Sequence, residues 1–505
     1  MPSGMKPTDK VPRVMSFLPF RRAVVMTAVM TALSACAVGP DFHRPEAPEV
    51  ERYTPSPLPD ATDAAPLPQG EAQRLVAGGE IPAQWWTLFG SQKLEQLIRE
   101  ALARSPNLAA AQAALHQAEQ IRRAEAGSLL PDLDGALSVE RRKFTGASFG
   151  QPGGPGGLFT LYNASVSVSY GLDPFGLARR RIESFQAQLD YQRFLLEGAR
   201  LTLASNLVTT VIQECSLRER IKATRAIIAT EEEQLHLVNI RMELGAAVRA
   251  ELLAQQAQLA QTRTTLPALE KELALTRHRL AVLAGLLPFQ AATLPEFDLE
   301  GLELPLELPV SLPSELVRRR PDIRASEELL HQASAQVGVA TANLFPRLTI
   351  TGDFGSQSPA PEELFSAGTG IWSIGAGVVQ PLFRGGELRA RREAALAGYS
   401  QAEALYRETV LIASQNVADV LRSLELDARA LKAQAEAEAA ARSSLELALT
   451  KYRAGAVNHL VLLDAQRQHQ QARISLAQAK AARFADSAAL FQALGGGWWN
   501  GKARE

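Results

Sequence analysis

Cysteine, histidine and long apolar runs are all scarce in this sequence of 505 residues. The seven histidines are scattered along the chain, a distribution that argues against a metal enzyme. The formal net charge is −1 and no strongly basic stretch occurs, so nothing suggests a nucleic acid as a partner. Beyond the N-terminus we find no run of about 18 apolar residues, and no transmembrane helix is expected.

The sequence motifs of common enzyme classes are missing as well. We find no Gly-x-x-x-x-Gly-Lys phosphate-binding loop, no His-Glu-x-x-His zinc site and no Gly-x-Ser-x-Gly nucleophile turn. The chain is therefore not expected to be an enzyme, to bind a metal or to carry a cofactor, apart from a covalently attached lipid.

The N-terminus has the form of a bacterial lipoprotein signal. Three arginines, Arg13, Arg21 and Arg22, precede an apolar stretch from Ala23 to Ala35, which meets the sequence Leu33-Ser34-Ala35-Cys36. This ending resembles a lipobox, in which the cysteine is acylated and becomes the new N-terminus, and alanine at position 37 is typical of lipoproteins sent to the outer membrane. We predict a signal peptide at residues 1–35 and a lipid on Cys36. The plainer interpretation is a buried cysteine after an ordinary signal. The start is Met1, Met5 or Met15.

The other cysteine, Cys215, is expected to be buried and unreactive. If Cys36 carries lipid, no disulfide can form within the chain. Cys215 continues an apolar series that steps by three and four residues, which is typical of one helix face. A small buried hydrophobic residue explains it.

Residues 36–85 are interpreted as a lipidated tether. Prolines and small or acidic residues crowd residues 43–70, and such a segment is extended and has little to bury. Trp85 and Trp86, at its end, are expected to pack rather than to bind a ligand.

The rest of the chain is an internal duplication. Three short sequence motifs recur after a constant offset of 215 residues, and other motifs recur after offsets of 207 to 210 residues. A period this long indicates a duplicated domain half rather than a solenoid. We assign the first repeat to residues 86–300, the second to 301–497 and a C-terminal tail to 498–505. The paired motifs contain Pro106 and Pro321, His116 and His331, and Pro131 and Pro346.

Each repeat has the same predicted order of elements: a helix, a β-hairpin and a long helix hairpin. The strict alternation from Ser165 to Tyr170 is typical of a strand with two distinct faces. A glycine then reverses each helix pair, near 245 and near 455. The expected helices are 93–127 and 314–342, then 177–243 and 387–454; the expected β-hairpins are 133–172 and 347–380.

Four strands per chain cannot close into a barrel. An open sheet edge in lipid leaves backbone groups unpaired, at several kcal/mol each. Membrane barrels begin at about eight strands, so strands that enter a membrane must be shared among chains. Two chains supply eight strands and three supply twelve, and the residues alone do not choose between them.

Short motifs spread over nearly the whole mature chain resemble the TolC-type outer-membrane efflux family, in its NodT/OprM lipoprotein branch. The resemblance implies a mixed α and β membrane protein. Three copies form a twelve-stranded outer-membrane β-barrel, with four strands per protomer, continued by a long periplasmic α-helical barrel. The motifs are Cys36 to Phe42, Trp85 to Phe89, Ser105 to Leu108, Gln380 to Phe383 with Gly385-Gly386, Tyr452 to Gly455, Leu462 to Arg467, and Ala493 to Trp498.

The same resemblance implies function and partners. The chain is expected in the outer membrane, lipid-anchored and extending into the periplasm. It would conduct passively what an inner-membrane RND-type transporter and a periplasmic adaptor deliver. Two alternatives stay open: the exit duct of a type I protein-secretion system, and a non-conducting periplasmic scaffold lipoprotein. The exported compound is not predictable, because the duct takes what the pump delivers.

The resemblance also implies a gate at the periplasmic tips. Leu460, Asp464 and Arg467 match positions of the family's constriction, and their spacing puts them on one helix face. Tyr452 matches a position that can latch neighbouring helices. Some relatives have a second aspartate where this chain has Val461, so the acidic ring here is expected to be single.

Two of these assignments have a plainer alternative. Asp464 could be a solvated carboxylate paired with Arg467, and Tyr452 could be a buried residue that only packs.

The residues expected to touch the adaptor are Gly245, Ala246, Ala247 and Val248 in the first repeat and Gly455, Ala456, Val457 and Asn458 in the second.

Overall fold

The computed structural model describes residues 37–50, 52–150 and 152–501. The predicted signal peptide, Cys36 and residues 502–505 lie outside the described residues. The chain divides into two compact units. Among the described residues, the sheet unit comprises 37–43, Glu119–Ala187 and Leu330–Gln401; the helical unit comprises Arg44–Ala118, Gln188–Leu329 and 402–501.

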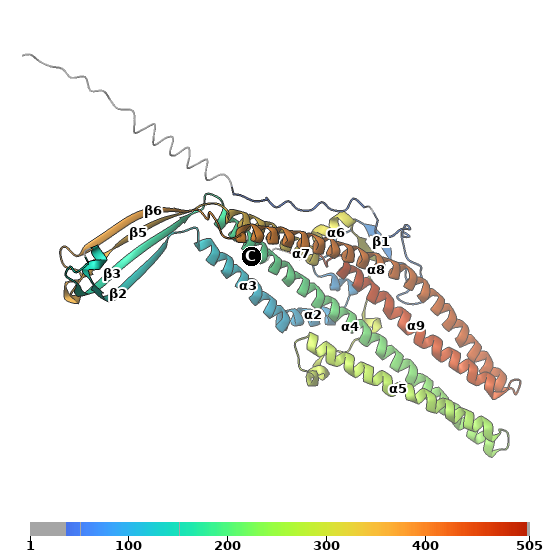
Figure 1. The fold of residues 1–505 in the computed structure, drawn as a ribbon. Helices are drawn as coiled ribbons and strands as arrows, with labels where there is room; N and C mark the ends of the chain where they lie inside the picture. Colours follow the sequence, from blue (N-terminus) through green and yellow to red (C-terminus); the bar gives the residue numbers. More distant parts are fainter. Residues whose placement is uncertain (1–36, 51, 151, 502–505) are drawn as a thin grey trace, which may run out of the picture. The chain divides into compact units, whose positions relative to one another are not determined.

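Helices dominate the described residues, and strands are few (Figure 1). The longer helices are α2 (Gln92–Arg104), α3 (Pro106–Gly127), α4 (Leu177–Glu243), α5 (Arg249–Leu283), α6 (Pro313–Arg319), α7 (Pro321–Ala342), α8 (Glu387–Arg453) and α9 (His459–Ala493). The strands are β1 (Arg74–Ala77), β2 (Asp132–Phe144), β3 (Gly157–Leu172), β4 (Glu307–Val310), β5 (Arg347–Ser358) and β6 (Gly370–Val379). Six 3₁₀ helices complete the order in the described part of the chain: η1 (Trp85–Phe89), η2 (Gly146–Phe149), η3 (Pro288–Thr293), η4 (Leu299–Gly301), η5 (Pro361–Glu363) and η6 (Trp498–Asn500).

Corresponding helices of the two halves have equal lengths. Helices α3 and α7 have 22 residues, α4 and α8 have 67, and α5 and α9 have 35. A helix of 67 residues is about 100 Å long at about 1.5 Å per residue. In Figure 1, α4 turns back into α5 and α8 turns back into α9, which makes two helix hairpins whose turns lie in the helical unit.

Two prolines divide what the periodicity predicts as single stretches. The helix expected over 93–127 is instead α2 and α3, separated at Ser105, whose backbone is extended. In the second half Arg320 separates α6 from α7 in the same way. Proline disfavours the helical conformation of the residue before it and is well placed at the first position of a new helix.

The sheet unit holds one antiparallel sheet with the strand order β2-β3-β5-β6. The two β-hairpins, one from each half of the chain, join through β3 and β5, where Tyr162 lies opposite Ser358 and Leu172 opposite Leu348. Strands β2 and β6 therefore form two edges that pair with nothing else among the described residues.

The interpretation of residues 36–85 as an extended tether with little to bury is wrong in part, because residues near both of its ends pack against distant segments. Strand β1 pairs in parallel with β4, and the buried Gln73 donates to the Pro305 carbonyl oxygen and the Ser487 hydroxyl, both at 2.8 Å. The buried Trp85 stacks on Phe491 at 5.4 Å between ring centroids. This segment folds because its partners are supplied from far along the chain. In the described part of the chain, no helix combines the length and apolarity that crossing a membrane requires.

Candidate functional site

Both helix hairpins turn at a glycine with a left-handed backbone. Gly245 has φ 73° and Gly455 has φ 72°, and in neither case would a Cβ meet a neighbour within 4 Å. The nitrogen of Ala246 donates to the Arg241 carbonyl at 2.7 Å, and that of Ala456 donates to Lys451 at 2.9 Å. These bonds, with a residue in the left-handed region, are the Schellman helix ending. The glycines are therefore needed for backbone conformation rather than for space.

The two tips begin their second helices differently. Asn458 precedes α9, and its side-chain oxygen accepts a hydrogen bond from the backbone nitrogen of Val461 at 3.2 Å. Val248 stands at the matching place before α5 and has no side chain to do this. The second tip therefore has a helix cap that the first lacks.

Tyr452 lies where four helices of the helical unit meet. It is buried on α8, and its hydroxyl donates to Glu251 of α5 at 3.4 Å. The Arg241 guanidinium of α4 lies 4.8 Å from the ring centroid, and the His459 ring of α9 lies 5.3 Å away. Burial, and then the Glu251 carboxylate, raise the pKa of Tyr452. A neutral tyrosine thus links one helix hairpin to the other through packing, a cation–π contact and a hydrogen bond.

Sequence reasoning missed three of these four residues. His459 is buried with neither ring nitrogen hydrogen-bonded in the described structure, and burial lowers its pKa. Arg241 and Glu251 lie close in sequence to the predicted tip residues 245–248, and this closeness is the feature of the sequence that could have identified them. Packing beside them is apolar: Tyr452 joins a buried cluster with Ala448, Leu462 and Ala465.

The three predicted constriction residues share an exposed face of α9. Leu460 is 65% exposed, and Asp464 and Arg467 are also exposed, whereas Leu462 lies buried between them. The Asp464 carboxylate accepts a hydrogen bond from Gln468 at 2.7 Å, and among the described residues it forms no salt bridge with Arg467. Within one chain this face is open.

The sheet has one apolar face and one polar face. Opposed residues on one face are apolar, as where Val166 lies opposite Phe354 and Phe354 opposite Trp372. On the other face Ser167 lies opposite Asp353, and the Ser373 hydroxyl donates to the Asp353 carboxylate at 3.0 Å. Large apolar side chains on the first face are exposed: Leu133, Leu137, Val139, Val166, Val168, Ile350, Phe354, Trp372, Ile374 and Val378.

The segment just after Cys36 lies on the sheet unit. Val38 nitrogen donates to the Phe175 carbonyl at 3.1 Å, and the buried Arg180 pairs with Asp41 at 2.7 Å. Phe42 stacks on His331, with 4.3 Å between ring centroids. His331 is the second-repeat counterpart of His116. Its contact with Phe42 therefore joins the duplicated part of the chain to the N-terminal segment, which is not duplicated.

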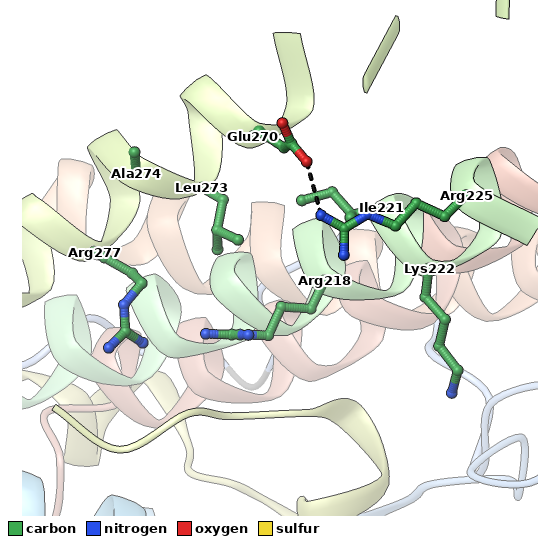
Figure 2. A pocket seen from close by; sticks show the side chains of 8 residues that line it. All are labelled: Arg218, Ile221, Lys222, Arg225, Glu270, Leu273, Ala274 and Arg277. Atoms are coloured by element: carbon green, nitrogen blue, oxygen red, sulfur yellow. Dashed lines mark hydrogen bonds and ion pairs between the residues drawn. The ribbon is translucent and has the colours of Figure 1, made fainter. Parts of the chain in front are cut away.

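A groove between α4 and α5 collects four cationic side chains (Figure 2). Its volume is about 550 Å³, and Ile221 and Leu273 contribute apolar lining. Arg225 pairs with Glu270 at 2.7 Å, as the dashed line in Figure 2 marks. Arg218 and Arg277 share the buried carboxylate of Glu214, at 2.8 and 2.6 Å. With its arginines paired, the groove serves as a structural ion-pair network.

The described residues offer few candidates for a metal site or for a reactive side chain. No group of three or more His, Cys, Asp or Glu side chains there is arranged to hold a metal ion. Cys215 is buried as the sequence predicts, and burial raises the pKa of its thiol, which keeps it protonated at neutral pH.

Comparison with known proteins gives a consistent match. The model of the outer membrane efflux protein family matches residues 97–286 and 312–496. The pyoverdine export outer membrane protein OpmQ of Pseudomonas aeruginosa is 34% identical over 457 residues, which cover 88% of this chain and 94% of that protein. Nodulation protein T of Rhizobium leguminosarum is 29% identical and covers 95% of this chain and 94% of its own length.

A solved structure has the same fold. The structure of the outer-membrane channel OprN superimposes with a TM-score of 0.82 at 29% identity, covering 92% of this chain and all of that one. The similarity therefore extends over both units of the chain.

Proposed function

Because this chain belongs to the outer membrane efflux protein family and is an outer-membrane channel component of an efflux pump, we propose that it conducts as a homotrimer with one shared twelve-stranded barrel. The observation that carries the proposal is the open sheet with two free edges, one apolar face and one polar face. Pairing β2 of one copy with β6 of the next removes both edges, and in a membrane each unpaired backbone group costs several kcal/mol. The apolar face then meets lipid and the polar face lines the pore.

The helix hairpins supply the periplasmic end of this duct. Three copies around one axis bring together three Leu460 and three Asp464 side chains, which on a single chain stand exposed on α9. A leucine ring resists water and solutes, and a carboxylate ring favours cations over anions. Arg467 lies one turn further along, and Tyr452 holds the two hairpins of each chain together behind the ring.

Energy and cargo come from partners. An inner-membrane transporter of the RND type and a periplasmic adaptor deliver the substrate, and the tips at residues 245–248 and 455–458 are the surfaces offered to the adaptor. A lipid on Cys36 anchors the chain in the outer membrane, and the seating of Ala37 to Phe42 on the sheet unit supports an anchor close to the barrel. The duct itself needs no cofactor and catalyses no reaction.

Single-channel recording in planar bilayers tests the duct and its gate. Wild-type protein is expected to conduct weakly, and Leu460→Ala with Asp464→Ala is expected to raise the resting conductance several-fold because both rings are removed. Leu447→Ala, at an exposed leucine of α8 outside the predicted gate, is the matched control. Equal conductance of the double variant and wild type would contradict the gate; no current from any variant would favour the scaffold alternative.

A further inference from the structure

The apolar face of the sheet continues into a cavity beside the β5–β6 loop. The cavity has a volume of about 660 Å³, and Leu137, Ala164, Val166 and Phe354 line it. Leu137 lies opposite Ala164, and Val166 lies opposite Phe354, so these four side chains project from one face. A cavity of this size, lined mainly by apolar groups, is in the range that binds small apolar ligands.

The loop that forms one wall uses its polar groups internally. Phe365, Ser366 and Thr369 of this loop line the cavity. The Ser356 hydroxyl donates to the Leu364 carbonyl, and the Thr369 hydroxyl donates to the Ser366 carbonyl at 2.9 Å. These bonds hold the loop over the apolar face, where Ser356 is buried. What the wall offers a ligand is chiefly the Phe365 ring.

Two cations follow on the same face of β2. Arg141 and Lys143 alternate in step with Leu137 and are exposed. At about 3.3 Å per residue, Arg141 lies about 13 Å further along the strand than Leu137. It is therefore nearer the end of the β2–β3 hairpin. A molecule with an acyl chain in the cavity and a phosphate at this distance would satisfy both features.

We propose that the cavity binds one acyl chain of an anionic membrane phospholipid, whose phosphate is held by Arg141 and Lys143. The proposal rests on the proposed function, since it needs the apolar face of the sheet to be in contact with lipid. The cavity would make that lipid a resident molecule, held in place while other lipids exchange along the rest of the face.

Native mass spectrometry of the full chain tests the site. The protein is released from micelles that contain phosphatidylglycerol or, in parallel, phosphatidylcholine. Gly135→Phe fills the cavity, because a Cβ at Gly135 meets nothing within 4 Å. We expect one phosphatidylglycerol per chain in wild type and at least a tenfold loss of retention in this variant. Gly352→Phe, on the same face outside the cavity lining, should retain the lipid.

Two further variants keep the test decisive. Phe365→Ala changes an exposed loop residue and should weaken retention without disturbing the strands. Arg141→Gln with Lys143→Gln should remove the preference for phosphatidylglycerol over phosphatidylcholine. Wild-type retention by Gly135→Phe or by Phe365→Ala would overturn the site. The same spectra report the assembly: a trimer without resident lipid contradicts only this inference, whereas a monomer contradicts the proposed function.

Discussion

At Tyr452 a single side chain is held by three kinds of contact from three other helices. Its ring lies against the Arg241 guanidinium and the His459 ring, and its hydroxyl reaches Glu251. The sequence left two interpretations of this residue open, a latch and buried packing. In the described residues Tyr452 is buried and contacts both hairpins of the same chain, and its role as a latch between neighbouring helices stays a prediction.

A partly buried pair of carboxyl groups makes stability depend on pH. On α9, burial and then the neighbouring Asp427 of α8 raise the pKa of Asp486 from 3.8 to about 8, while Arg483 opposes the shift. Between about pH 4 and pH 8 the folded chain retains a proton that the unfolded chain releases. This contribution is therefore complete at low pH and is lost as the pH rises through about 8.

We expect Asp486→Asn to flatten this dependence. The amide of the variant does not titrate, so its thermal unfolding midpoint should fall less than that of wild type between pH 6 and pH 9. Asp464→Asn, at an exposed carboxylate, is the control and should keep the wild-type slope. Parallel curves for wild type and Asp486→Asn would contradict the assignment.

Among the elements, the two tips show how one residue separates duplicated structures. Both turn at a left-handed glycine, but only α9 has a capping side chain, from Asn458. A helix cap of this type stabilises its first turn by about 1 kcal/mol. The second tip is thus expected to open less often than the first.

Hydrogen exchange at the tips measures this difference. Asn458→Ala should speed exchange of the Val461 amide about fivefold, because about 1 kcal/mol of capping is lost. Val248→Asn should slow exchange at the start of α5. Unchanged exchange in both variants would show that the cap contributes nothing here.

For the whole molecule, the sheet poses the main physical problem. Its free edges and exposed apolar face are unstable in water for one chain, and the proposed trimer in a membrane resolves both. Ile374→Arg places a charge on the apolar face, where 77% of the side chain is exposed. Such a charge at mid-membrane depth costs about 2–4 kcal/mol.

Insertion into liposomes tests this placement. Ile374→Arg should reduce the inserted fraction well below that of wild type. Ser138→Arg, on the polar face of β2, should insert normally, because that side would face the pore. If both variants insert equally well, the two faces have been assigned wrongly.

Local patterns in the sequence determined the long helices, the alternating strands and the glycine turns. Each depends on residues within a few positions of one another, through periodicity or through backbone conformation. The sequence also located Leu460, Asp464 and Arg467 on one helix face, since three- and four-residue steps need no knowledge of the fold.

Only the tertiary structure decided the pairings between distant segments. Gln73 donates hydrogen bonds to Pro305 and to Ser487, which lie 232 and 414 residues away. Because of these bonds, a segment that the sequence predicts to be a tether is packed against the rest of the chain. The joining of β3 to β5, the contact of Arg241 and Glu251 with Tyr452, and the cavity under the β5–β6 loop arise in the same way. Such contacts depend on how whole elements pack, and no local pattern of residues specifies that.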